Sequence, residues 1–237
     1  MRLVVTRPQP DGNRTAAALR ERGHDVLVAP LMRAEPVAAD LGGTFAGIVV
    51  TSANAPRAIG DHPQFTALKS LPVFAVGKRS AEAAREAGFS DVASADGDAA
   101  DLLRLIAAQR AAAALPLLYL AGQERAADIA GELARKGMTA KTVVVYRAVT
   151  LPFPDELSEA LGTREVEAVL HFSARSAGNY LSGAKAAGLL TAALEPCHFC
   201  LSAQTAAPLA AAGAATISIA AQPDEAALIA LVERAQG

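Results

Sequence analysis

The 237-residue chain contains no tryptophan, and aromatic residues make up only 4 % of it. This scarcity argues against aromatic platforms on which nucleic-acid bases could stack. The formal net charge is −2, so a basic surface for nucleic acid is not expected either. Apolar runs of about 20 residues, the length that a membrane span needs, are also missing. We therefore expect neither a nucleic-acid partner nor a membrane partner.

Cysteine is almost as scarce. The chain has only two cysteines, which cannot build a disulfide framework. The chain opens on a strand-like segment rather than a signal peptide, and these features together predict a cytoplasmic protein. Cys197 and Cys200 fall in a second strand-like segment, where residues three apart point to opposite faces. They are therefore expected to be core thiols rather than a redox or zinc pair. The four histidines have no metal-ligand spacing, so no metal is expected.

Short β-branched runs alternate with polar turns and with helices rich in alanine and leucine. This alternation predicts α/β architecture with parallel sheets covered by helices. Four pairs of segments also recur in the same order along the chain, which predicts a duplication. The pairs are residues 19–23 with 133–137, 51–54 with 172–175, 77–81 with 202–206, and 98–103 with 224–229.

The duplication predicts two similar flavodoxin-like domains of about five parallel strands each, one inserted in the other. Residues 1–34 plus 152–237 are expected to form the first, discontinuous domain, and residues 38–145 the second. Segments 31–37 and 146–152 contain or adjoin prolines, which disfavour helix, and they are predicted to be the strands of a two-stranded linker.

Polar turns follow six of the predicted strands, at the sheet edge where α/β proteins bind ligands. These turns contain five basic residues and one acid, Glu124, which favours an anionic ligand held between the two halves. Serine and threonine at such positions are also typical helix caps, so both roles stay open. The residues are Arg7; Ser52 and Asn54; Lys78, Arg79 and Ser80; Gln123 and Arg125; Ser173, Arg175 and Ser176; and Gln204 and Thr205.

Two further residues have an open role at this stage. Tyr146 ends a valine run, and its ring is expected either to face the ligand or to pack between the halves; a phenol can donate a proton to a leaving group. His171 directly precedes a polar turn and is expected either beside the ligand or buried and hydrogen-bonded. Glycine-rich phosphate loops and nucleophile-elbow motifs are absent from the sequence.

Taken in order, these segments resemble the uroporphyrinogen-III synthase family over nearly the whole chain. Ser80 replaces the threonine that the family often has, and Ser202 replaces its second glycine, which could narrow the approach of backbone to ligand there. The matching motifs are Val4-Val5-Thr6-Arg7-Pro8, Val50-Thr51-Ser52-Ala53-Asn54-Ala55, Ala75-Val76-Gly77-x-x-Ser80-Ala81, Gly122-x-x-Arg125, Val145-Tyr146-Arg147, Phe172-Ser173-x-x-Ser176 and Thr205-Ala206.

The resemblance implies a lyase that needs no cofactor and works in haem biosynthesis, with its active site between two α/β domains. It would cyclise hydroxymethylbilane, a polycarboxylate tetrapyrrole, to uroporphyrinogen III, inverting ring D and losing water. We also expect a monomer. Tyr146 is the catalytic candidate, and the substrate-binding candidates are Arg7, Ser52, Asn54, Lys78, Ser80, Gly122, Arg125, Ser173, Ser176 and Thr205.

Two other functions stay open at this point. The fold alone is compatible with a two-lobed binding or sensory module that closes on a small acid without chemistry. A nucleotide-sugar glycosyltransferase with two Rossmann-like lobes is the third possibility, although its lobes would be unusually small in a chain of this length.

Overall fold

The structure is a computed structural model that describes residues 1–110, 114–125 and 127–235. Its contacts divide the chain into two compact units. Unit 1 consists of Met1–Arg33 together with Val149–Gly237, and unit 2 consists of Ala34–Ala148. The two boundaries fall inside the segments for which linker strands are predicted. Within the described residues, no helix is both long and apolar enough for a membrane span.

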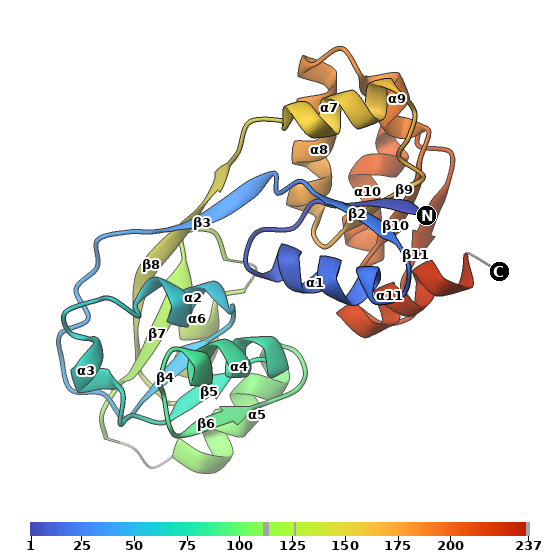
Figure 1. The fold of residues 1–237 in the computed structure, drawn as a ribbon. Helices are drawn as coiled ribbons and strands as arrows, with labels where there is room; N and C mark the ends of the chain where they lie inside the picture. The colour runs from blue at the N-terminus through green and yellow to red at the C-terminus, as the bar shows by residue number, and fades with distance from the viewer. Residues whose placement is uncertain (111–113, 126, 236–237) are drawn as a thin grey trace. The chain divides into compact units, whose positions relative to one another are not determined.

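Unit 1 is built on a five-stranded sheet in the order β11-β10-β9-β1-β2, and each neighbouring pair is parallel (Figure 1). In chain order within the unit this is the 2-1-3-4-5 arrangement of flavodoxin-like sheets. The strands are β1 (Arg2–Val5), β2 (Asp25–Val28), β9 (Ala168–His171), β10 (Cys197–Cys200) and β11 (Ile217–Ile219).

Helices cover both faces of this sheet, which is why its central strands are continuous apolar runs. Val4 faces the core beneath α7, α8, α9 and α10, while Leu3 and Val5 face the core beneath α1 and α11. Cys200 and Cys197 likewise lie in these two different cores, as predicted. The helices are α1 (Asp11–Arg20), α7 (Asp155–Gly162), α8 (Ala174–Ala186), α9 (Leu190–Leu194), α10 (Ala203–Ala212) and α11 (Glu225–Arg234).

Unit 2 contains a six-stranded sheet in the order β3-β8-β7-β4-β5-β6, parallel from β8 to β6. The edge strand β3 runs antiparallel to its neighbour β8, because Val37 N donates to Val145 O whereas Leu151 N donates to Leu31 O. The strands are β3 (Met32–Pro36), β4 (Gly47–Val50), β5 (Val73–Ala75), β6 (Val92–Ser94), β7 (Leu117–Gly122) and β8 (Ala140–Thr150).

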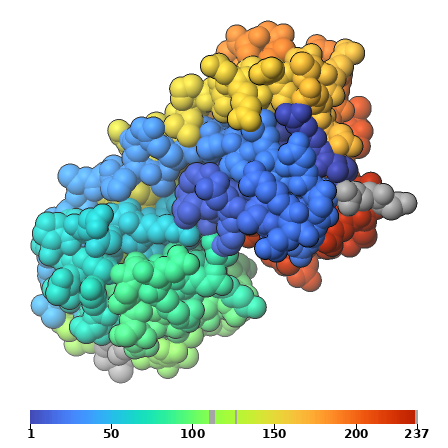
Figure 2. Space-filling view, in the orientation of Figure 1, coloured from blue at the N-terminus to red at the C-terminus, as the bar shows by residue number. Residues whose placement is uncertain are grey.

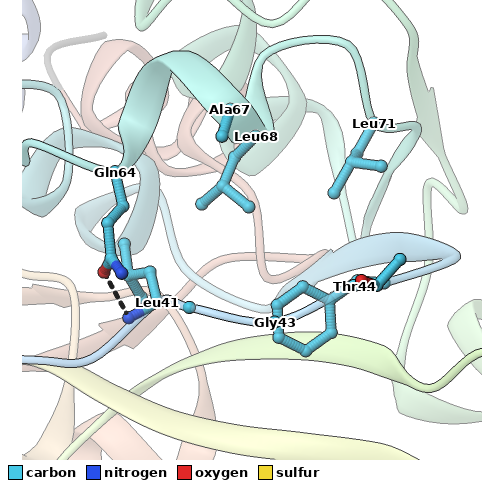
Figure 3. Close-up of a pocket in the computed structure, with 9 residues that line it drawn as sticks. Leu41, Gly43, Thr44, Gln64, Ala67, Leu68 and Leu71 are labelled. Carbon is cyan, nitrogen blue, oxygen red and sulfur yellow. Dashed lines mark hydrogen bonds between the residues drawn. The ribbon is translucent and has the colours of Figure 1, made fainter.

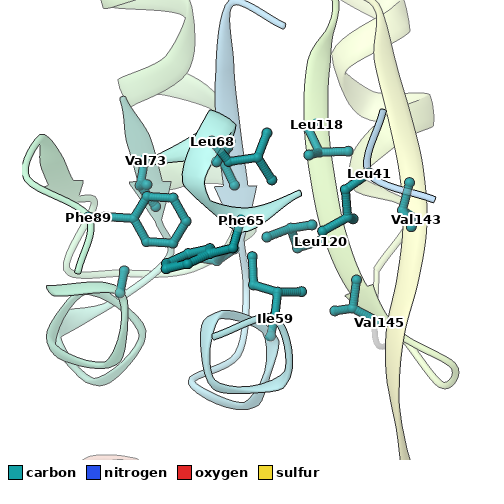
Figure 4. Packing of buried hydrophobic residues seen from close by; sticks show 14 of the residues in the cluster. Leu41, Ile59, Phe65, Leu68, Val73, Phe89, Leu118, Leu120, Val143 and Val145 are labelled. Carbon is teal, nitrogen blue, oxygen red and sulfur yellow. The ribbon is translucent and has the colours of Figure 1, made fainter. Parts of the chain in front are cut away.

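The core of unit 2 also has two layers, and Figure 4 shows one of them. Phe65 and Phe89 meet edge to face there, with ring centroids 5.1 Å apart, against Leu118 and Leu120 of β7. Side chains close the spaces that the ribbon leaves between neighbouring elements of the unit (Figure 2). Helices α2, α3 and α4 cover this face, and α5 and α6 cover the other. Their bounds are α2 (Asn54–Ala58), α3 (Phe65–Leu68), α4 (Lys78–Glu86), α5 (Ala99–Arg110) and α6 (Ile129–Arg135).

The five parallel strands of each unit are arranged in the same way, β2-β1-β9-β10-β11 in unit 1 and β8-β7-β4-β5-β6 in unit 2, although they come in a different order along the chain. In unit 1, β1 and β2 continue the sheet of β9 to β11; in unit 2, β7 and β8 continue the sheet of β4 to β6. The first two strands of each sequence repeat therefore complete the sheet formed by the last three strands of the other repeat. The predicted fold class, two similar parallel α/β halves, is confirmed.

The helix that follows the turn with Gln123 and Arg125 does not begin directly after that turn. α6 starts at Ile129, because Asp128 is its N-cap and its carboxylate accepts a hydrogen bond of 3.0 Å from Gly131 N. An N-terminal cap of this kind determines where a helix can begin.

His171 proves to be buried and hydrogen-bonded, one of the two roles left open for it. Its Nε2 atom lies 3.1 Å from Nδ1 of His198 on the neighbouring strand, and both residues are completely buried. The Tyr180 ring packs against both imidazoles, with centroid distances of 5.3 Å and 6.0 Å. Burial lowers the pKa of His198 to about 4 and lowers that of His171 well below its ordinary value.

Acid is therefore expected to destabilise unit 1 through this pair. The unfolded chain binds protons that the folded chain excludes. The contribution of the two neutral histidines to the free energy of unfolding is therefore fully present above about pH 6.5 and is lost as the pH falls toward 4. His198 alone accounts for about 3 kcal/mol of this loss at pH 4. Urea unfolding measured across this range should show it.

The matched control compares two sets of variants. Replacing both His171 and His198 by leucine should reduce the pH dependence in this range; a part should remain, because burial also lowers the pKa of His24. His62→Gln, which removes a histidine of unit 2 instead, should not produce this reduction. An unchanged slope in the double variant would mean that other groups cause the acid sensitivity.

Candidate functional site

A pocket of about 310 Å³, lined by both apolar and polar side chains, lies in unit 2 where β4, β5 and β7 end. The register brings these ends together, because Val50 pairs with both Ala75 and Leu120. Four of the predicted site residues line it: Ser52, Gly122, Arg125 and Tyr146. The other lining residues are Thr51, Val76, Ala99, Tyr119, Glu124, Ala127 and Ile129. We call this cavity the unit 2 pocket.

Tyr146 reaches the pocket through an irregularity in the pairing of β7 with β8. Ala121 pairs with Val144, but Gly122 pairs with Tyr146, so Val145 is an extra residue and forms a β-bulge. Bulges of this kind redirect side chains and are frequent beside active sites. The backbone is held there by a 2.9 Å hydrogen bond from Gln123 N to Tyr146 O.

Gly122 gives the Tyr146 ring its space. A Cβ atom at position 122 would lie 2.7 Å from Cζ and 2.8 Å from Oη of Tyr146. Carbon atoms do not approach that closely without displacement, so the ring rests directly on the glycine backbone. The role of Gly122 that the structure shows is therefore steric.

The polar groups of the pocket are hydroxyls, one basic residue, Arg125, and one acidic residue, Glu124. Ser52 is half-buried, and its Oγ accepts a hydrogen bond of 3.2 Å from Asn54 N at the start of α2. Arg125 is exposed at the rim. Thr51 Oγ1 lies 3.0 Å from Oη of Tyr119, whose side chain is only 3 % exposed. The sequence prediction missed Thr51 and Tyr119, since Leu118-Tyr119-Leu120 has the pattern of an ordinary buried strand.

The remaining predicted residues of unit 2 lie outside this pocket lining. Asn54 and Lys78 are the first residues of α2 and α4. Asn54 is half-buried and Lys78 is exposed. Ser80 is only 5 % exposed within α4. Solvent and ligands can therefore reach Asn54 and Lys78, whereas the Ser80 hydroxyl is enclosed by its own unit.

A second cavity of unit 2, of about 260 Å³, differs in chemistry (Figure 3). It lies at the opposite ends of β4 and β5, where Leu41, Phe45, Leu68 and Leu71 line it, and Leu41 N donates to Gln64 Oε1 at 2.8 Å. Its lining includes no charged residue. The unit 2 pocket offers Arg125 and hydroxyl groups to an anionic group, beside one carboxylate, Glu124, whereas the second cavity offers no cation.

In unit 1, Arg7 is held by neighbouring groups. Its guanidinium pairs with Asp11 at 3.5 Å and Glu225 at 3.3 Å, and it stacks 4.2 Å from the centroid of Phe172. The side chain is 15 % exposed. Two carboxylates thus already compete for its charge, which favours a structural role within unit 1.

The predicted hydroxyls of unit 1 divide into a cap and two buried groups. Ser173 caps α8, since its Oγ accepts from Ser176 N at 3.1 Å. Ser176 is completely buried, with its Oγ 2.9 Å from Oγ1 of Thr6. Thr205 is 3 % exposed, and its Oγ1 lies 3.1 Å from Oγ of Ser202. The structure thus places Ser176 and Thr205 in the interior.

Ser202 stands where the family has its second glycine, and the structure gives this serine a role in unit 1. It is the N-cap of α10, and its Oγ accepts from Thr205 N at 3.2 Å. The corresponding Gly77 begins α4 without a side-chain cap. The serine therefore supplies a cap that its counterpart lacks.

The fold is that of a two-unit α/β protein with a pocket at the carboxyl ends of parallel strands in unit 2. A family model described as uroporphyrinogen-III synthase HemD matches residues 13–230. The chain belongs to the uroporphyrinogen-III synthase family, whose members act as synthases in tetrapyrrole biosynthesis, and its substrate is a tetrapyrrole.

Solved structures show the same fold. The uroporphyrinogen-III synthetase of Helicobacter pylori superposes with a TM-score of 0.70 at 19 % identity, over 99 % of this chain and 100 % of that one. A mutant uroporphyrinogen III synthase of Thermus thermophilus gives 0.53 at 19 % identity, over 100 % and 98 %. No curated protein sequence matches the chain.

Gly122→Ala is expected to displace the Tyr146 ring. The added methyl group overpacks the site, so the free energy of unfolding should fall by about 1–3 kcal/mol. Synthase turnover should also fall, because Tyr146 loses its position. Urea unfolding and steady-state kinetics measure the two effects.

Gly60→Ala is the matched control, because Gly60 is exposed and a Cβ there meets only Arg57 O at 3.7 Å. It should leave both quantities close to those of the unmodified protein. Wild-type turnover in Gly122→Ala would show that the ring position is unimportant.

Proposed function

We propose that the chain cyclises hydroxymethylbilane to uroporphyrinogen III with inversion of ring D and loss of water, as a hydro-lyase. The observation that carries this proposal is the position of Tyr146. Its side chain lines the unit 2 pocket together with Ser52 and Arg125, and a bulge aims it there. A proton donor beside groups that attract carboxylates is what this reaction requires.

Carboxylate binding is assigned to the polar groups of the unit 2 pocket. Arg125 offers a cation at the rim, and Ser52 offers a hydroxyl at the start of α2. Hydrogen bonds from such donors to a carboxylate are stronger than bonds between neutral groups. Lys78 and Asn54 are weaker candidates for the same role. In unit 1, Ser173 is the candidate hydroxyl that a ligand can reach, because it is half-buried whereas Ser176 and Thr205 are buried.

The chemistry needs only one proton from the enzyme. Tyr146 Oη–H would protonate the departing ring A hydroxyl, which leaves as water while the pyrrole nitrogen supplies the electron pair. The substituted position of ring D then attacks the electron-poor azafulvene to give a spiro intermediate, which fragments and recloses with ring D inverted. Loss of the ring D proton restores the pyrrole, and that proton can return to the Tyr146 phenolate.

The protein's main contribution would be to hold rings A and D so that this route outruns direct closure. Direct closure needs no enzyme and gives the isomer without inversion. The assignment of the ligand to a site between the two halves stays a prediction, as do the monomeric state, the cytoplasmic location and the absence of a nucleic-acid partner.

The direct test supplies enzymatically made hydroxymethylbilane and separates the product isomers by chromatography. We expect isomer III in excess, formed faster than the spontaneous reaction. Isomer I alone, at the uncatalysed rate, would contradict the proposal and favour a binding module without catalysis.

Tyr146→Phe should lower kcat by about 10- to 100-fold, because the variant loses the proton donor and keeps the ring. KM should change by less than about threefold, since carboxylate binding depends on other groups. Steady-state kinetics with hydroxymethylbilane measure both constants.

Tyr180→Phe is the matched control. Tyr180 lies in the core of unit 1, where its hydroxyl donates to Ala193 O at 3.0 Å. Its loss should lower thermal stability and leave kcat unchanged at temperatures well below Tm. Equal kcat in wild type and Tyr146→Phe would remove Tyr146 from the mechanism.

A further inference from the structure

A second tyrosine hydroxyl borders the unit 2 pocket, and the mechanism above does not use it. Tyr119 lies in the middle of β7, and its ring packs in the apolar cluster that contains Val49 and Phe74. Its Oη atom leaves this cluster and lies 3.0 Å from Oγ1 of Thr51. Both residues line the pocket.

Packing alone does not account for this hydroxyl. Phenylalanine would fill the same space in the cluster, as Phe74 does on the strand β5. A buried hydroxyl has to find a partner to offset the loss of its hydration. The partner here is a second hydroxyl at the edge of the pocket, rather than a backbone carbonyl inside the core.

The protons of this pair can be counted. Each hydroxyl carries one proton, and the bond between them uses one of the two. Tyr119 is 3 % exposed, whereas Thr51 is half-buried and follows directly after β4. A phenol is also a better donor than an aliphatic alcohol. These properties favour Tyr119 as the donor and Thr51 as the acceptor.

The Thr51 proton then remains available to the pocket. Within residues 1–110, 114–125 and 127–235, Thr51 Oγ1 makes no other hydrogen bond. A hydroxyl that accepts one hydrogen bond becomes a stronger donor in the next. The pair thus presents one oriented, strengthened donor, a match for a carboxylate oxygen.

We propose that Tyr119 is a positioning residue for the synthase: it holds the Thr51 hydroxyl so that Thr51 binds a carboxylate of the tetrapyrrole. The inference rests on the proposed function, since it uses the unit 2 pocket as the substrate site. It differs from the role of Tyr146, because Tyr119 acts on substrate binding through Thr51 and takes no part in proton transfer.

Tyr119→Phe tests this role and keeps the ring that packs in the core. KM for hydroxymethylbilane should rise by about three- to tenfold, since a charged hydrogen bond is weakened, while kcat stays within about twofold of wild type. A Tm decrease of no more than about 5 °C is expected from one lost hydroxyl. Unchanged KM in the folded variant would overturn the proposal.

A double-mutant cycle separates positioning from independent binding. Thr51→Val should raise KM at least as much as Tyr119→Phe, and the double variant should be no worse than Thr51→Val, because Tyr119 acts through Thr51. Thr51→Ser keeps the hydroxyl and should restore most of the affinity. Additive effects in the double variant would show that Tyr119 does not act through Thr51.

Binding is also measured without turnover, using uroporphyrin III as the probe, because it keeps the carboxylate side chains and is fluorescent. Its Kd should follow the same order across these variants, and Tyr180→Phe should leave it unchanged. If wild type forms no isomer III, the proposed function fails, and the Kd series still decides the role of Tyr119. Equal Kd values in wild type and Tyr119→Phe would refute that role.

Discussion

The parallel register of β4, β7 and β8 is the constraint on which the candidate site depends. Val50 pairs with Leu120, so the turn after β4 lies beside the end of β7. One extra residue in β8 then places Tyr146 opposite Gly122. Since side chains alternate along a strand, a register shift of one residue would turn this ring to the other face. The hydrogen bonds of the backbone therefore decide which side chains share the pocket.

The same principle operates on a larger scale in the exchange of strands between the two repeats. β1 and β2 complete the sheet of β9 to β11, while β7 and β8 complete that of β4 to β6. Neither half of the sequence forms either sheet by itself. Each sheet requires contacts between residues far apart in the chain, which ties the folding of the two repeats together.

Burial separates hydroxyl groups that look alike in the sequence. Ser52 and Thr51 border the unit 2 pocket, whereas Ser176 bonds to Thr6 inside unit 1 and Thr205 bonds to Ser202. A hydroxyl near a helix start can satisfy either the backbone or a ligand. The internal partners of Ser176 and Thr205 indicate that their hydroxyls mainly tie helices to their surroundings.

The sequence by itself determined the α/β class and the duplication, and it predicted several residues of the unit 2 pocket, because apolar periodicity and the order of polar turns are local properties. Ser52 and Arg125 were predicted from the polar turns, Gly122 and Tyr146 were assigned through the family resemblance, and all four line one pocket. Only the tertiary structure decided the strand exchange, the bulge at Tyr146 and the bond between Thr51 and Tyr119. These depend on registers between strands distant in the chain, and on burial, which local patterns do not encode.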